Sequence, residues 1–335
     1  NIAIVGATGN VGRKIIEILE KKQINIENLF LLASKNSEGK KINYNGKEHT
    51  VTNLEKFDFS SVKIAFFAAG SEVAEKWAHV AAEKTIVIDN SKYFRKDPDI
   101  PLIVPEVNSK KLSDVKNKNI IANANCSVIP VVVALKPLHD LYNINRIVAS
   151  TYQSVSGAGK SAMDELLSQT EDYFQNKEID SKNFTKQIAF NAIPHIDSFL
   201  ENGYTKEEQK TTDEIKKILD KKIKVTSTCV RIPVLVSHCI SANVEFNKKC
   251  DLDEIRKVLS TSPGCKVIDE HQDGGYITPV EAEDKFETFI SRIRLDESRE
   301  NTINLWIVSD NLVKGAALNA VQIAESLITN DFYGR

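Results

Sequence analysis

Two residues of this chain have the types and surroundings needed for covalent chemistry. Cys126 lies in the segment NANCSVIP, followed by an apolar run in which Pro130 suits the first turn of a helix. We therefore expect Cys126 at a helix N-terminus, where the dipole lowers the pKa of a thiol and favours a nucleophile. The alternative is a buried structural cysteine, since cysteine often packs as a small hydrophobic residue.

A cysteine nucleophile needs an acid/base partner, and histidine is the usual one. Of the six histidines, His238 in RIPVLVSH is the candidate, because the others lie in polar, helical or semi-buried surroundings. A thiolate beside a nicotinamide can form a thioester or thiohemiacetal, while the cofactor gives or takes a hydride. Arg231 and His238 are seven residues apart, so a regular strand would point them to opposite faces. If both face one site, the chain must bend between them, near Pro233.

The start of the chain predicts where such a cofactor binds. The apolar run IAIV leads into glycines 6, 9 and 12, and apolar residues then recur at helical spacing. A strand, a glycine turn and a helix let the backbone approach a phosphate, which the free N–H groups of the helix can bind. The spacing GxxGxxG is a variant of the usual fingerprint, and a turn built for packing is the alternative.

The second expected strand, 29–33, indicates which nucleotide binds. NAD-binding proteins usually place an acid near the end of this strand for the ribose 2′-hydroxyl. Here Ser34, Lys35 and Ser37 follow, and the first acid is Glu38. A cation and hydroxyls favour NADP, whose 2′-phosphate needs positive charge; a solvated loop lysine is the alternative.

Alternating strands and helices up to about residue 125 predict a parallel sheet covered on both faces, a Rossmann-type doubly wound α/β fold. Beyond it, longer strands predict an α+β domain with a mixed sheet. We expect residues 1–125, completed by a C-terminal helix at 312–335, to bind NADP, and residues 126–311 to carry catalysis and dimerisation. The other expected strands are 64–68, 85–89, 146–155, 223–236, 240–247, 288–295 and 303–309, and the other helices are 72–83, 159–173, 206–221, 251–260 and 316–328.

Composition limits the possible partners. The chain has 335 residues, 44 Lys+Arg against 46 Asp+Glu, and a formal net charge of −2. This balance gives no support to nucleic-acid binding or to an anionic membrane surface. The cysteine count of 5 is odd, and neither a CxxC nor a zinc spacing occurs, so we expect no metal site and a reduced, cytoplasmic protein.

Nine segments in order resemble the aspartate-semialdehyde dehydrogenase family. They are IVGATGNVG, LLASKNSEGK, FFAAGSEVA, DNSKYFRKDPDIPLIVPEVN, NANCSVIP, TYQSVSGAGKSAMDEL, GYTKEEQKTTDEIKKIL, RIPVLVSHCISANVEF and DNLVKGAALNAVQIAE. The resemblance implies a homodimer that uses NADPH to reduce L-aspartyl 4-phosphate to L-aspartate 4-semialdehyde. Phosphate leaves, and the product serves lysine (through diaminopimelate), threonine and methionine synthesis.

The resemblance also implies residue roles. Cys126 forms the acyl-enzyme, Gln153 orients it and His238 is the general acid/base. Arg231 would bind the substrate carboxylate, which suits a guanidinium fork, and Glu207 its ammonium. Lys210 and Arg95 would hold the phosphate, with Asn125 beside the nucleophile. The cofactor residues it implies are Gly6, Thr8, Gly9, Asn10, Val11, Ser34, Lys35, Ser37, Ala69, Gly70, Ser156, Gly157 and Asn319.

Several alternatives stay open. Glu207 and Lys210 stand three apart on a predicted helix, where a solvated ion pair with Glu214 and Lys217 is the ordinary interpretation. Gln153 in a strand could face solvent. Asn319 could be a satisfied core amide, and Arg95 a surface residue. Ser237 stands where many relatives have Gly, which bears on the backbone before His238.

The nearest rival activity is that of N-acetyl-glutamyl-phosphate reductase, for which an acid in the amine pocket is less useful. A glyceraldehyde-3-phosphate dehydrogenase would carry an acid directly after the second strand. A non-catalytic NADP-binding regulator would be expected to lose Cys126, Gln153 or His238, and all three are present.

Overall fold

The computed structural model describes residues 1–329, and the last six residues of the expected C-terminal helix lie outside the described part. The chain divides into two compact units, which are described separately. The first contains residues 1–124 and the C-terminal segment from residue 316, and the second contains residues 125–315.

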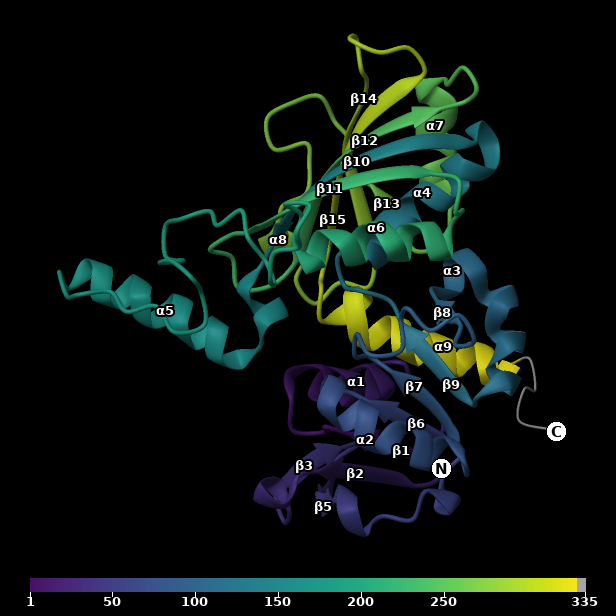
Figure 1. The fold of residues 1–335 in the computed structure, drawn as a ribbon, viewed down its shortest axis with the longest axis vertical. Helices are drawn as coiled ribbons and strands as arrows, with labels where there is room; N and C mark the ends of the chain where they lie inside the picture. The colour runs from purple at the N-terminus through teal and green to yellow at the C-terminus, as the bar shows by residue number, and fades with distance from the viewer. Residues whose placement is uncertain (330–335) are drawn as a thin grey trace. The chain divides into compact units, whose positions relative to one another are not determined.

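A seven-stranded parallel sheet forms the core of the first unit, in the order β5-β2-β1-β6-β7-β9-β8 (Figure 1). This confirms the predicted Rossmann-type sheet. Its strands are short and mostly apolar, as expected for strands buried on both faces. They are β1 (Ile2–Val5), β2 (Leu29–Ala33), β5 (Thr52–Asn53), β6 (Ile64–Phe67), β7 (Ile86–Asp89), β8 (Leu102–Ile103) and β9 (Ile120–Asn123).

Helices complete the first unit. They include α1 (Asn10–Lys21), α2 (Ser71–Ala82), α3 (Pro105–Asn108) and α9 (Leu318–Thr329). The C-terminal helix α9 packs against α1, α3 and β7, so the chain returns to the first unit with this helix. An antiparallel pair that the sequence pattern did not predict, β3 (Lys41–Tyr44) and β4 (Lys47–Thr50), lies outside this sheet.

The second unit is built on a six-stranded mixed sheet, in the order β11-β10-β12-β15-β14-β13. Its strands are β10 (Ile144–Gln153), β11 (Lys224–Arg231), β12 (His238–Phe246), β13 (Cys265–Val267), β14 (Thr288–Leu295) and β15 (Thr302–Ser309). The central strands alternate between buried and half-buried residues, which is typical of a sheet covered more completely on one face. The helices α4 (Val128–Tyr142), α6 (Lys206–Ile218) and α7 (Leu252–Thr261) pack against this sheet.

One predicted strand is wrong in extent. Residues 223–236 were expected to form one strand, but β11 ends at Arg231 and His238 begins β12. The residues between them are irregular, and Ser237 has a φ of 75°. The expected bend between Arg231 and His238 is therefore present.

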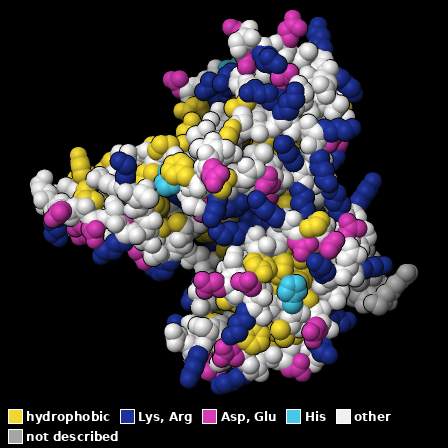
Figure 2. Space-filling model, in the orientation of Figure 1, with side chains coloured by type: hydrophobic (Ala, Val, Ile, Leu, Met, Phe, Trp, Pro, Cys, Tyr) yellow, Lys and Arg dark blue, Asp and Glu magenta, His cyan; other side chains and the backbone are white. Residues whose placement is uncertain are grey.

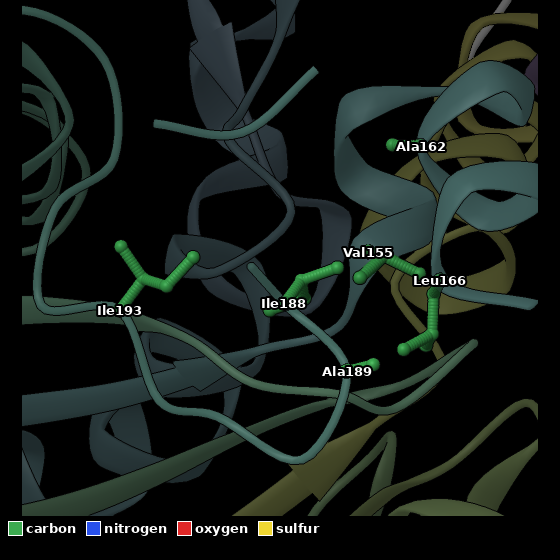
Figure 3. Packing of buried hydrophobic residues seen from close by; sticks show 6 residues of the cluster. All are labelled: Val155, Ala162, Leu166, Ile188, Ala189 and Ile193. Atoms are coloured by element: carbon green, nitrogen blue, oxygen red, sulfur yellow. The ribbon is translucent and has the colours of Figure 1, made fainter. Parts of the chain in front are cut away.

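The helix α5 (Lys160–Phe174) extends from the second unit and packs on the turn before it (Figure 1). A small hydrophobic cluster joins this helix to the segment that follows it; its buried members are Val155, Ala162, Leu166, Ile188, Ala189 and Ile193 (Figure 3). Ile193 also exchanges two backbone hydrogen bonds with Arg231, of 2.8 and 2.9 Å. The cluster therefore supports both the turn after β10 and the end of β11.

Candidate active site

The nucleophile candidate lies immediately before the longest apolar helix of the second unit. Ser127 is the N-cap residue of α4, so Cys126 is one residue ahead of the helix end, as predicted. Its Sγ lies 3.4 Å from Nε2 of His238, the first residue of β12. Cys126 is partly exposed, whereas His238 is fully buried. The buried-cysteine alternative therefore does not describe Cys126, and a sulfur and an imidazole stand in contact.

The surroundings of His238 keep its ring neutral at ordinary pH. Burial, and secondly the nearby guanidinium of Arg231, lower its pKa to about 3. The backbone N–H of Ser154 points at Nδ1 over 3.1 Å. A neutral histidine this close to a thiol can exchange a proton with it.

Gln153 and Arg231 end neighbouring parallel strands. They are paired in the register of β10 and β11, and both are buried, so the solvent-facing alternative for Gln153 is wrong. Arg231 donates from Nη1 to the carbonyl oxygen of Ser154 over 2.6 Å. Burial lowers its pKa, against the opposing effects of Cys126 and Glu207. A cation at this depth needs anionic partners, which a carboxylate ligand can supply.

Glu207, which is buried, pairs with the half-buried Lys210, so this is not the solvated stripe considered above. Glu207 is 7% exposed, and its two carboxylate oxygens accept from Nζ of Lys210 and Nδ2 of Asn125, over 2.8 and 2.9 Å. Lys210 also donates to Asp197 over 2.8 Å. Burial acts to lower the pKa of Lys210, but the two carboxylates outweigh it and raise that pKa.

The turn after β10 borders the same site. A Cβ on Gly157 would lie 3.2 Å from Nη1 of Arg231 and 3.3 Å from the ring of His238. Glycine therefore leaves the space that adjoins both side chains. Ser156, one residue earlier, is buried and bonded to Asn311.

In the first unit, the glycine turn borders a cavity of about 740 Å³. A Cβ on Gly6, whose φ is 85°, would lie 2.6 Å from the carbonyl oxygen of Ala68, and one on Gly12 would lie 2.2 Å from that of Gly6. The backbone therefore packs so closely at Gly6 and Gly12 that neither position has room for a side chain. The cavity is lined by Val5, Gly6, Thr8, Gly9, Ala33, Ser34, Lys35, Asn36, Asn53, Leu54, Glu55, Ala68, Ala69, Glu72, Val73, Lys76 and Trp77.

Comparisons with known proteins agree with this geometry. Residues 1–115 match the semialdehyde dehydrogenase NAD binding domain, and residues 135–314 match the semialdehyde dehydrogenase dimerisation domain. The aspartate-semialdehyde dehydrogenase of Rickettsia bellii is 49% identical over 98% of this chain and 97% of its own length. The crystal structure of aspartate semialdehyde dehydrogenase II from Vibrio cholerae, at 47% identity, has a TM-score of 0.97 over 99% of both chains.

The chain belongs to the aspartate-semialdehyde dehydrogenase family. It is an oxidoreductase whose first domain takes a nicotinamide cofactor. The predicted family resemblance is thereby confirmed.

The other cofactor candidates implied by the family resemblance are not among the residues that line the cavity of the first unit. Asn10 and Val11 open α1, Ser37 ends a 3-10 turn that starts at Lys35, and Gly70 precedes α2. Asn319 is fully buried in α9 and donates to Ile103 O over 3.0 Å and to Asn123 Oδ1 over 2.6 Å. Its side-chain N–H groups are thus used inside the first unit, as the core-amide alternative expects.

Arg95 also lies in the first unit of the chain. It donates to the carbonyl oxygens of Asn123 and Asn90, over 2.9 and 3.0 Å. It is therefore anchored to backbone and is not a freely solvated surface arginine.

Sequence reasoning missed several residues at these sites. Ser154 contacts Nδ1 of His238 and donates from Oγ to Asn311, and Glu214 accepts the backbone N–H of Asn125 over 2.6 Å. In the cavity of the first unit it missed Lys76 and Trp77. Ser154 directly follows Gln153 and leads into the turn at Gly157, so its place in the sequence was a usable signal. Spacing carried no signal for the others. Among the described residues, no group of three or more His, Cys, Asp or Glu could hold a metal ion, and no helix is long and apolar enough to cross a membrane.

Proposed function

We propose that the chain catalyses NADPH-dependent reductive dephosphorylation of L-aspartyl 4-phosphate to L-aspartate 4-semialdehyde, and the reverse reaction with phosphate. The observation that carries this is the 3.4 Å contact between Cys126 and His238, beside the buried Arg231 and Glu207. A related structure from Vibrio cholerae, 47% identical, is described as complexed with ASA.

The charges of the site fit the substrate. Aspartyl phosphate carries an ammonium, a carboxylate and an acyl phosphate, so its site needs one anion and several cations. Arg231 would bind the carboxylate as a fork, Glu207 the ammonium, and Lys210 and Arg95 the phosphate. An acetylated amine carries no charge for Glu207 to meet, so the acetyl-glutamyl substrate fits less well.

The proposed reaction starts at the sulfur. His238 takes the thiol proton at Nε2, and Sγ attacks the acyl carbon while the C–O bond to phosphate breaks, which leaves a thioester on Cys126. Gln153 and Asn125, both buried next to Glu207, orient that acyl group. When bound, the reduced nicotinamide would supply the hydride that converts the thioester to a thiohemiacetal anion, whose C–S bond then breaks. His238 then returns the proton to sulfur as the aldehyde leaves.

Lys35 supports NADP as the cofactor. It lines the cavity of the first unit together with Ser34 and Asn36, whereas Glu38, the first acid after β2, is paired with Lys56 over 2.9 Å. A lysine supplies positive charge for a 2′-phosphate. The other proposed cofactor contacts are those of the glycine turn, Ala69, Gly70, the Ser156–Gly157 turn and Asn319.

A homodimer is the proposed assembly, because residues 135–314 match a dimerisation domain. One face of the sheet is less completely covered. Ser241 and Asn243 of β12, and Trp306 of the paired strand β15, are half-buried, while the residues next to them along each strand are buried. Large hydrophobic residues are also exposed in the segment of α5, including Leu167, Tyr173 and Phe174, and Figure 2 shows hydrophobic side chains there. Sedimentation of the purified protein would test the dimer.

All five cysteines are free, which supports the proposed cytoplasmic location.

The test of function is reduction of NADP⁺ with L-aspartate 4-semialdehyde, with and without phosphate. We expect turnover that requires phosphate and disappears in Cys126→Ala. NAD⁺ should be used less well, and Lys35→Ala should raise KM for NADP⁺ more than for NAD⁺. Turnover of N-acetyl-glutamate semialdehyde instead would move the assignment to the rival reductase. Cofactor binding with no turnover of either aldehyde would indicate a regulator.

A further inference from the structure

Nδ1 of His238 has two possible partners on one residue. Ser154 places both its backbone N–H and its Oγ 3.1 Å from this nitrogen. The direction of the backbone N–H is fixed, so it favours an Nδ1 without a proton. The hydroxyl can rotate, so it can either donate to Nδ1 or accept from it.

Asn311 determines which way that hydroxyl points. Its Oδ1 lies 3.1 Å from Ser154 Oγ and 3.2 Å from Ser156 Oγ, and it accepts the backbone N–H of Ser237 over 2.8 Å. Its Nδ2 is 2.9 Å from Ser156 Oγ. When Ser154 donates to Asn311, a lone pair of Ser154 Oγ is left for Nδ1.

Burial makes this arrangement consequential. His238, Ser154 and Ser237 are 0% exposed, Asn311 is 2% and Ser156 is 3% exposed. A change in the protonation of His238 must therefore be met by groups of the chain rather than by bulk water. The charged or titratable groups that act on His238 are Cys126 before α4, Arg231 at the end of β11 and Glu207 on α6.

Proton transfer at Nε2 requires the other ring nitrogen to carry a proton. To take the thiol proton, Nε2 must present a lone pair, so the neutral ring must hold its proton on Nδ1. After the transfer the imidazolium still holds it there, while the sulfur has become a thiolate. In both states Nδ1–H needs an acceptor. The backbone N–H of Ser154 cannot accept and favours the other tautomer, so the Ser154 hydroxyl must outweigh it.

We propose that Ser154 and Asn311 are positioning residues that hold His238 in the tautomer able to act as a base. Ser154 Oγ accepts from Nδ1–H, and Asn311 Oδ1 accepts the hydroxyl proton of Ser154 and so keeps that hydroxyl in its accepting orientation. We call the contacts from Cys126 through His238 and Ser154 to Asn311 the relay. It consists of a nucleophile, a base and the groups that orient the base. It rests on the proposed roles of Cys126 and His238.

The test is the pH dependence of Cys126 alkylation by iodoacetamide, followed by mass spectrometry of the peptide that contains Cys126. In Ser154→Ala the imidazolium loses its acceptor, so the alkylation midpoint should move up by about one pH unit. In Asn311→Asp a carboxylate replaces the amide, which favours the imidazolium, so the midpoint should move down. The opposite directions separate a proton role from a packing role.

Ser309→Ala is the matched control. Ser309 is the strand neighbour of His238, is 1% exposed, and its hydroxyl has no hydrogen-bond partner among the described residues. The pH midpoint of Cys126 alkylation in Ser309→Ala should equal that of the wild type. In turnover, Ser154→Ala should lower kcat about 10- to 100-fold with little change in KM.

Two outcomes would overturn the relay. One is a midpoint in Ser154→Ala equal to that of Ser309→Ala, and the other is a shift in the same direction in Ser154→Ala and Asn311→Asp. If Ser154→Ala does not fold, the downward shift in Asn311→Asp decides alone. Alkylation needs neither cofactor nor aldehyde. If the two variants show these shifts but the wild type turns over no aldehyde, the proposed function is refuted and the relay still stands.

Discussion

Cys126, the proposed nucleophile, packs against a neighbour that has no side chain. Gly315 lies in a π-helical turn, Val313–Ala317, that packs against the backbone of Cys126. A Cβ at Gly315 would lie 3.0 Å from Cβ, 3.1 Å from O and 3.2 Å from Cα of Cys126. Backbone and Cβ atoms cannot turn aside as a long side chain can, so any added atom must displace the nucleophile itself.

We therefore predict that Gly315→Ala lowers kcat by about 100-fold, because a nucleophile displaced by a fraction of an ångström no longer meets its reaction geometry. Steady-state kinetics would measure this, and the rate of Cys126 alkylation would show whether the thiol also lost its contact with His238. Activity within about twofold of the wild type would mean that the π-helical turn yields instead.

At the scale of elements, the first turn of α6 carries both a cap and substrate candidates. Thr205 accepts from the backbone N–H of Glu208, and the Glu208 carboxylate accepts from the backbone N–H of Thr205 over 2.7 Å. The other carboxylate oxygen of Glu208 accepts from the backbone N–H of Cys229 in β11, over 3.0 Å. The cap therefore fixes where α6 starts relative to the sheet, and with it the position of Glu207.

Thr205→Ala should destabilise the protein by about 1 kcal/mol, since it removes the acceptor for one helix N–H. Urea unfolding would measure the change. A Thr205→Ser variant retains the acceptor and should recover most of the loss. Equal destabilisation in both variants would point to packing of the Thr205 methyl group as the cause.

At the scale of the whole molecule, the buried site makes stability depend on pH. The pKa of His238 is lowered to about 3 in the folded state, against about 6.5 for an unfolded histidine. The unfolded chain then binds the extra proton first as pH falls. The stability that comes from burying a neutral His238 is complete above about pH 6.5 and is lost as pH falls from there toward 3.

Comparison with His238→Asn isolates this contribution, because the other titrating groups are common to both proteins. Between pH 7 and pH 5, the wild type should lose about 2 kcal/mol more unfolding free energy than the variant. Urea unfolding at a series of pH values would measure the difference. A difference that does not change with pH would mean that His238 has a similar pKa in both states.

Local patterns were enough to predict most of the longer elements and the place of Cys126, the proposed nucleophile, before α4. Short apolar strands, helical repeats and the glycine turn depend on neighbours within a few residues, so the longer strands and helices of both units could be predicted, whereas β3, β4, β5, β8, β9 and β13 were missed. The position of Cys126 before α4 follows from the apolar run and Pro130 in the same way. The resemblance then pointed to His238, Arg231 and Glu207.

Tertiary structure decided what those residues have as neighbours. Nothing local shows that Glu207 is buried, that Arg231 and Gln153 end adjacent strands, or that Ser237 takes a left-handed φ of 75° so that His238 can begin a new strand. His238 contacts Cys126 and Ser154, which lie 112 and 84 positions away along the chain, and Ser154 in turn contacts Asn311, 157 positions away. Sequence alone determined the element pattern and the reactive residue types, because these depend on short-range periodicity. Burial, register and hydrogen-bond partners are set by long-range packing, and they decide the protonation state of the site.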